Sequence, residues 1–153
     1  MFDVVGFGNS VLDIIVDVED DFIKQNNLTK GNFLLIGDEE SKNFNEILKG
    51  KKAIHFPGGS VSNIIAGITI LGGNTAYIGG IGNDENGKEY LDSTTKEGIQ
   101  NLFVQKEGNT GVCLTFITTD GERTFAVNLG KCNYISHDEV DTNFETKIML
   151  IEG

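Results

Sequence analysis

The sequence has little of several residue types on which specialised folds and chemistries depend. Among its 153 residues there are one proline, two cysteines, two histidines and no tryptophan. Cys113 and Cys132 form no CxxC pair and have no histidine at a ligand spacing, so neither a disulfide framework nor a zinc site is expected. Neither histidine falls into a catalytic triad pattern, and the sequence has no GxSxG segment and no P-loop.

Positive charge and long apolar segments are scarce as well. Twelve Lys and Arg residues stand against 23 Asp and Glu residues, which gives a formal net charge of −11. Such a chain repels a phosphate backbone and has no basic cluster, so nucleic acid is not an expected partner. The most apolar segment, 64–71, is too short to span a bilayer, and the first residues do not resemble a leader. We therefore expect a cytoplasmic protein with no membrane partner.

Length and composition favour a single globular domain, with 39% hydrophobic and 23% charged residues. Strand-like and helix-like segments alternate at first, which predicts a parallel sheet covered by helices. The pattern then changes to strands at 99–105, 111–119 and 122–129, and an Asp-Gly turn joins the last two. The whole predicts an α/β fold in which a small β-sheet stands off the main one as a lid. The other expected strands are 2–7, 33–36, 52–56, 75–81 and 147–152, and the expected helices are 20–26, 38–48, 60–71, 83–96 and one that starts at 136.

The stretch 55–63, His-Phe-Pro-Gly-Gly-Ser-Val-Ser-Asn, has the features of a ligand-binding turn. Pro57 favours an extended residue before it and so ends a short strand. Gly58 and Gly59 then allow a tight turn and leave no side chain between the main-chain N–H groups and a bound molecule. The alternative is an ordinary strand-to-helix turn without a ligand.

A helix is predicted directly after this glycine turn, with Ser60 or Ser62 as its N-cap, because apolar residues recur at helical spacing from position 61 onward. Its N-terminus would point at the turn. Asn63 lies away from the apolar stripe, so it could reach the same ligand. Alternatively, Asn63 is only a solvated capping residue.

Asn9 and Asp13 follow the first predicted strand, at the carboxyl end where open α/β sheets bind ligands. A dinucleotide-binding GxGxxG pattern is not met, because Val11 stands where its last glycine would be. Asp13 lies in an apolar run, where a buried carboxylate needs hydrogen bonds such as a polyhydroxylated ligand would donate. In the alternative, 12–18 is a strand whose solvent-exposed face carries Asp13.

Arg123 directly follows the predicted hairpin turn and is one of the few cations in the chain. From a small sheet above the main one, it could reach over an anionic ligand. The alternative is a solvated arginine that discourages pairing at a strand edge.

Five glycine-containing motifs follow one another along the chain: Gly8–Asp13, Gly58–Asn63, Gly79–Gly87, Asn109–Cys113 and Asp120–Thr124. In this order they resemble the ribokinase-like, or PfkB, family of sugar and nucleoside kinases, and within it the adenosine kinase-like branch. The resemblance covers essentially the whole chain. It implies a three-layer α/β sandwich with a small β-sheet lid, whose strands would lie within 12–36 and 110–129.

The resemblance also implies an activity, the ATP-dependent phosphorylation of a hydroxymethyl group on a sugar or nucleoside, with ATP and Mg²⁺ as cofactors. Asp13 would bind the sugar hydroxyls, and Arg123 would approach the transferring phosphate. The other substrate-binding residues would be Asn9, Gly58, Gly59, Ser60 and Asn63. Whether the substrate is a nucleoside or a simple sugar stays open; apolar side chains such as Phe33, Leu35 or Phe116 would have to select a base.

One part of the family pattern is missing from these 153 residues. The family's catalytic base is an Asp in a Gly-Ala-Gly-Asp motif late in the chain, beside the nucleotide site, and no such motif occurs before Gly153. The sequence therefore resembles the amino-terminal half of such a kinase, and we expect negligible phosphate transfer by this chain alone. A half-sheet exposes a strand edge, so we also expect self-association. The alternative function is a catalytically inactive sugar- or nucleoside-binding or regulatory module.

Overall fold

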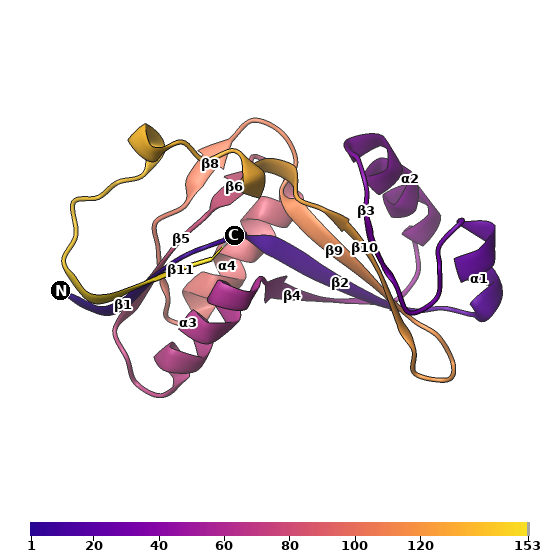
Figure 1. Cartoon of the computed structure of the whole chain (residues 1–153), viewed down its shortest axis with the longest axis horizontal. Helices are drawn as coiled ribbons and strands as arrows, with labels where there is room; N and C mark the ends of the chain where they lie inside the picture. Colours follow the sequence, from indigo (N-terminus) through magenta and orange to yellow (C-terminus); the bar gives the residue numbers. More distant parts are fainter. Residues whose placement is uncertain (153) are drawn as a thin grey trace. The chain divides into compact units, whose positions relative to one another are not determined.

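The computed structural model describes residues 1–152, which divide into two compact units (Figure 1). The first unit comprises Met1–Leu12, Pro57–Gly111 and the segment that begins at Leu129. The second comprises Asp13–Phe56 and Val112–Asn128. The expected lid boundaries, 12–36 and 110–129, stay a prediction. No helix within residues 1–152 combines the length and the apolar character that crossing a membrane requires.

A parallel sheet in the order β11-β1-β5-β7 is the centre of the first unit. Its core is formed by Val5, Ala76 and Ile78. Helix α3 packs closely on β1, because Gly6 has no side chain: a Cβ there would lie 2.6 Å from side-chain carbons of Val61 and Ile65. The elements of this unit are β1 (Phe2–Phe7), α3 (Ser60–Ile70), β5 (Thr75–Ile78), β6 (Gly80–Gly82), α4 (Glu85–Lys96), β7 (Gln100–Asn101), β8 (Val104–Lys106), the 3₁₀ helices Gly130–Asn133 and His137–Glu139, and β11 (Thr146–Ile151).

Two predicted strands are each broken in the structure. The predicted strand 75–81 divides into β5 and β6 at Gly79, where a Cβ would lie 2.0 Å from the Ser10 hydroxyl oxygen. The predicted strand 99–105 divides into β7 and β8, and its intervening Phe103 packs edge-on against the ring of Tyr77. Strands β6 and β8 then pair with each other in a separate two-stranded sheet. Both breaks result from tertiary contacts.

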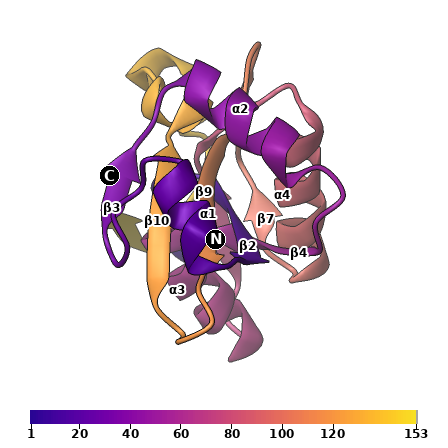
Figure 2. The ribbon, with the colours of Figure 1, turned by 90° about the vertical axis from the view of Figure 1, so that its right-hand side faces the viewer.

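A five-stranded sheet in the order β3-β10-β9-β2-β4 contains the strands of the second unit. Its β9 and β10 form the predicted antiparallel hairpin. Helices α1 and α2 cover one face, since Phe22 of α1 and Phe44 of α2 both pack against Phe116, with ring centroids 5.0 and 5.5 Å apart (Figures 1 and 2). The elements are β2 (Val11–Asp17), α1 (Asp20–Gln25), β3 (Phe33–Leu35), α2 (Asp38–Leu48), β4 (Ala53–Gly58), β9 (Gly111–Ile117) and β10 (Arg123–Asn128).

Two helices differ from the sequence-based predictions. Gly59, not Ser60 or Ser62, is the N-cap of α3, whereas α2 (Asp38–Leu48) has the predicted bounds. The helix expected from position 136 is only the short 3₁₀ helix His137–Glu139. The helix predicted over 83–96 is α4, and the Asp84 carboxylate caps it by accepting a hydrogen bond from the Gly87 N–H at 2.9 Å.

Candidate functional site

The glycine turn lies against the main chain that follows β1. Gly59 has φ +98°, a conformation that residues with a side chain rarely adopt, and a Cβ there would lie 2.3 Å from the Asn9 carbonyl oxygen. Helix α3 follows at once, and its Asn63 N–H donates to the Gly59 carbonyl at 3.0 Å. The structure thus brings Asn9, Gly59 and the N-terminus of α3 together at the carboxyl end of β1.

Other polar groups lie at the same edge of the parallel sheet. Asn63 is exposed on the first turn of α3, and the Ser60 hydroxyl donates to the Glu152 carboxylate at 3.1 Å. Glu152 follows β11, and its N–H donates to the Phe7 carbonyl at 3.1 Å. Because the carboxyl ends of parallel neighbours β1 and β11 meet at one edge, Glu152 belongs to the candidate site. The sequence analysis missed it, since its only signal was its place at the end of a predicted strand.

Tyr90 is a second residue that the sequence analysis missed. Its side chain is completely buried, and its hydroxyl donates to the Gly58 carbonyl at 2.8 Å. The two residues are separated by 32 positions. Nothing in the local pattern of α4 indicates this contact.

Asp13 lies in β2 of the second unit and is half-buried. The strand of the alternative interpretation is therefore present, and Asp13 and Asp17 lie on its less buried face, where Asp13 is half-buried and Asp17 is exposed. Burial raises the pKa of the Asp13 carboxyl, and a hydrogen bond from the Cys113 thiol acts in the opposite direction. A partly desolvated carboxylate of this kind is suited to accept hydrogen bonds from a neutral donor such as a hydroxyl group.

Arg123 is exposed at the start of β10. It is paired with Ile117, whereas Val127 is paired with Cys113, the residue that contacts Asp13. Four residues of strand place Arg123 about 13 Å along the hairpin from that contact. Strand β3 pairs with Phe125–Val127, so Arg123 lies beyond the residues that this strand pairs, and its role stays a prediction.

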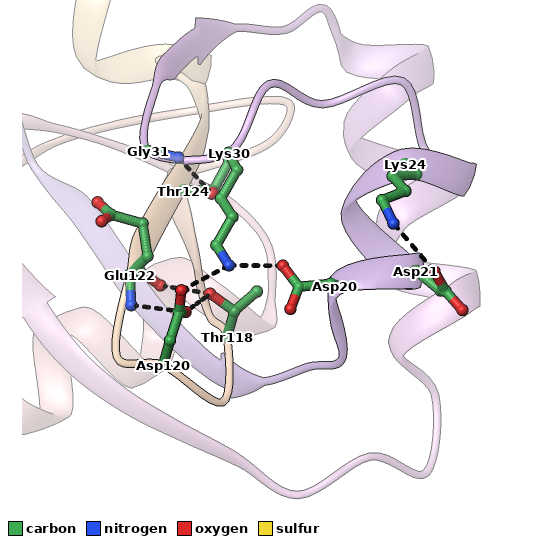
Figure 3. Close-up of polar contacts among 9 residues, drawn as sticks. All are labelled: Asp20, Asp21, Lys24, Lys30, Gly31, Thr118, Asp120, Glu122 and Thr124. Carbon is green, nitrogen blue, oxygen red and sulfur yellow. Dashed lines mark hydrogen bonds and ion pairs between the residues drawn. The ribbon is translucent and has the colours of Figure 1, made fainter.

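The turn before Arg123 is fixed by a lysine-centred network (Figure 3). The Lys30 ammonium lies 2.5 Å from an Asp20 carboxylate oxygen and 2.8 Å from one of Asp120. The Thr118 hydroxyl also donates to Asp120 at 2.7 Å. Lys30 and then Thr118 lower the pKa of the Asp120 carboxyl to about 2. The hairpin turn is thereby tied to α1 and to the loop before β3.

Two of the sequence motifs meet in a purely internal contact of the first unit. The Asp84 carboxylate accepts hydrogen bonds from the Thr110 hydroxyl at 2.5 Å and from the Thr110 N–H at 3.0 Å. The Thr110 hydroxyl accepts in turn from the Gly82 N–H at 2.9 Å. These contacts join the motifs Gly79–Gly87 and Asn109–Cys113, and they give Asp84 and Thr110 a structural role.

The three apolar side chains named as candidates for selecting a base differ in their burial. Phe116 is completely buried beneath α1 and α2, so its selection as a ligand contact was wrong. Phe33 and Leu35 remain 64% and 59% exposed on β3. Within residues 1–152, no group of three or more His, Cys, Asp or Glu side chains is arranged to hold a metal ion.

Comparison with known proteins identifies the family. Residues 30–153 match the family model described as pfkB family carbohydrate kinase, and this range is most of the chain. The chain belongs to the pfkB family. This finding confirms the resemblance that the five ordered motifs indicated.

Individual nucleoside kinases are similar to the chain over most of its length. The chain is 31% identical over 144 residues to the guanosine-inosine kinase of Escherichia coli, a match that covers 90% of the chain and 33% of that protein. The adenosine kinase of Sinorhizobium meliloti has a TM-score of 0.81 at 27% identity, covering 98% of this chain and 46% of that one. The adenosine kinase of Schistosoma mansoni, solved with adenosine, has a TM-score of 0.81 at 26% identity and coverages of 97% and 46%. The α/β fold class is confirmed, and the chain spans a third to a half of these relatives' lengths.

Proposed function

We propose that this pfkB-family chain supplies the acceptor-binding part of an ATP-dependent kinase that phosphorylates a hydroxymethyl group, with a purine nucleoside as the acceptor. The observation that carries the proposal is the close approach of Gly59 to the Asn9 carbonyl at the carboxyl edge of the parallel sheet. It leaves a glycine main chain, a helix N-terminus and Asn63 available to a neutral, hydroxyl-rich molecule.

Asp13 is proposed to accept hydrogen bonds from sugar hydroxyls. Its half-buried position supports this role, because hydroxyl donors would offset the desolvation that raises the pKa of its carboxyl. Support for a nucleoside over a simple sugar comes from the related kinases, which are named for guanosine, inosine and adenosine. The exposed apolar side chains of Phe33 and Leu35 offer surface to a base.

The strands within 12–36 and 110–129 are proposed to act as the lid, with Arg123 contacting the transferring phosphate. A closed lid excludes water, so that the acceptor hydroxyl and not water receives the phosphoryl group. ATP and Mg²⁺ would be the donor and its metal. We assign no residue of this chain as their principal ligand, and we propose that the catalytic base lies in sequence outside these 153 residues.

The acceptor proposal is tested by calorimetric titration of the 153-residue chain with adenosine, guanosine and ribose. We expect a purine nucleoside to bind more tightly than ribose. Asp13→Asn should weaken nucleoside binding by about 1.5–3 kcal/mol, or ten- to a hundredfold in Kd, since a charged acceptor is lost. Asp17→Asn is the matched control, because Asp17 lies in the same strand but is exposed.

Each outcome decides part of the proposal. Tight binding of ribose without nucleoside binding would transfer the preference to a carbohydrate acceptor. An unchanged Kd in Asp13→Asn would remove Asp13 from the site. If none of the three compounds binds, the acceptor role of this chain is contradicted.

A further inference from the structure

Three hydroxyl-bearing side chains lie completely buried in the first unit, close to the glycine turn. They are Ser10, Tyr77 and Tyr90. The rings of Tyr77 and Tyr90 each pack edge-on against Phe103 with the centroids 5.6 Å apart. The two tyrosines therefore pack on the same phenylalanine ring.

Their hydroxyl groups differ in what they contact. The Tyr90 hydroxyl donates to the Gly58 carbonyl at 2.8 Å. The hydroxyls of Tyr77 and Ser10 lie close enough to the Tyr90 hydroxyl to influence its pKa, but among residues 1–152 neither has a partner in hydrogen-bond geometry. Burial raises the pKa of Tyr77 to about 12 and that of Tyr90 well above its usual value, so both phenols stay protonated at neutral pH. Tyr90 is thus the tyrosine that donates to the glycine turn.

The direction of the Gly58 carbonyl determines the direction of the next N–H group. The described chain has no cis peptide bond, and in a planar trans peptide the C=O and N–H point to opposite sides. A Gly58 carbonyl held toward buried Tyr90 therefore directs the Gly59 N–H away from the interior. Glycines rotate more freely than other residues, so this peptide would have other orientations available without that bond.

We propose that Tyr90 is a positioning residue for the acceptor site: its hydroxyl fixes the Gly58–Gly59 peptide so that the Gly59 N–H faces the bound molecule. The role of the N–H rests on the proposed function, whereas the fixing of the peptide does not. Tyr90 itself is too deeply buried to touch a ligand at the turn. Its influence on binding acts through the main chain of the turn.

The test compares Tyr90→Phe with Tyr77→Phe. Both changes delete one phenol oxygen from a completely buried ring, but only the first removes the hydrogen bond to Gly58. Amide hydrogen exchange of residues 58–63, resolved by NMR, measures how rigid the glycine turn is when no ligand is present. Titration with adenosine measures the affinity of the proposed acceptor site.

In Tyr90→Phe we expect amide exchange in the turn to accelerate about five- to tenfold, and the Kd for adenosine to rise by a similar factor, while exchange in β1 and β5 stays unchanged. In Tyr77→Phe both quantities should match the unaltered chain. Exchange of the turn in Tyr90→Phe at the unaltered rate would overturn the proposal. Equal acceleration in both variants would also overturn it, because general loosening of the core would then explain the effect.

The two proposals fail separately. If the turn loosens in Tyr90→Phe but the unaltered chain binds no nucleoside, Tyr90 orients the peptide and the acceptor function is wrong. If the chain binds adenosine and Tyr90→Phe binds it equally well despite faster exchange, the orientation of the Gly59 N–H is irrelevant to binding. If Tyr90→Phe does not fold, 3-fluorotyrosine at position 90 is the second variant: its more acidic hydroxyl should slow exchange in the turn, and unchanged exchange would refute the proposal.

Discussion

The replacement Gly59→Ala should destabilise the chain more than alanine at another glycine of similarly positive φ. Gly59 has φ +98°, and an added Cβ would lie 2.3 Å from the Asn9 carbonyl oxygen. The backbone conformation alone costs a residue with a side chain about 1–2 kcal/mol. The contact adds an overpacking cost of about 1–3 kcal/mol, because its partner is main chain at the end of β1 and cannot rotate away.

Gly72→Ala is the matched control. Gly72 follows the other end of α3 with φ +91°, and no atom of residues 1–152 would lie within 4 Å of its Cβ. Only the conformational cost, about 1–2 kcal/mol, is then expected. In urea denaturation, Gly59→Ala should lower the free energy of unfolding by about 2–5 kcal/mol. Equal losses in the two variants would refute the argument that Asn9 and the turn are in close main-chain contact.

Three further predictions concern the second unit, the chain as a whole and the open sheet edge. The pairing of Asp120 with Lys30 should stabilise the fold above about pH 4 and lose this effect as the pH falls toward about 2, because the folded-state pKa of the Asp120 carboxyl is lowered. In acid titration, Asp120→Asn should lack this pH-dependent part of the stability. A stability profile equal to that of the unaltered chain would contradict the prediction. A coupled assay with adenosine and ATP should show negligible turnover by the 153-residue chain, and substantial turnover would show that the base is not missing. Analytical sedimentation should show that the chain associates as its concentration rises, and Ile148→Lys should reduce this association. Among the described residues β11 is an edge strand, and Ile148 on it is 58% exposed. A monomer at all concentrations would contradict the prediction.

Much of the fold was predictable because most elements follow from local patterns. The periodic segments 38–48 and 85–96 are helices, and the Asp-Gly turn at 120–121 joins two antiparallel strands. The breaks at Gly79 and before β8 were not predictable. Apolar residues continue through the second point, and the glycines at the first point do not show that a new strand follows. Only contacts with Ser10 and Tyr77 show where the chain leaves the sheet.

The site was predictable to the extent that its groups lie close together in sequence. The turn at Gly58 and Gly59 was found from the nine adjacent residues 55–63, whose conformational preferences agree. Glu152 and Tyr90 were not found, because their contacts span 92 and 32 positions and involve residue types that are common elsewhere in the chain. The burial of Phe116 beneath α1 and α2 could not be predicted, because strand alternation does not reveal which face the helices cover.

A glycine that the structure requires is not, for that reason, a ligand-binding glycine. A Cβ at Gly82 would lie 2.2 Å from the Gly108 carbonyl oxygen, and one at Gly87 would lie 2.3 Å from that of Gly82, so both are needed for internal packing. Gly59 meets a main-chain carbonyl just as closely. What distinguishes it is its place: it is only half-buried, it directly precedes α3, and it lies at the carboxyl edge of the parallel sheet. The motifs around Gly82 and Gly59 both support membership of the family, but only this combination of edge, helix terminus and accessible main chain supports a binding role.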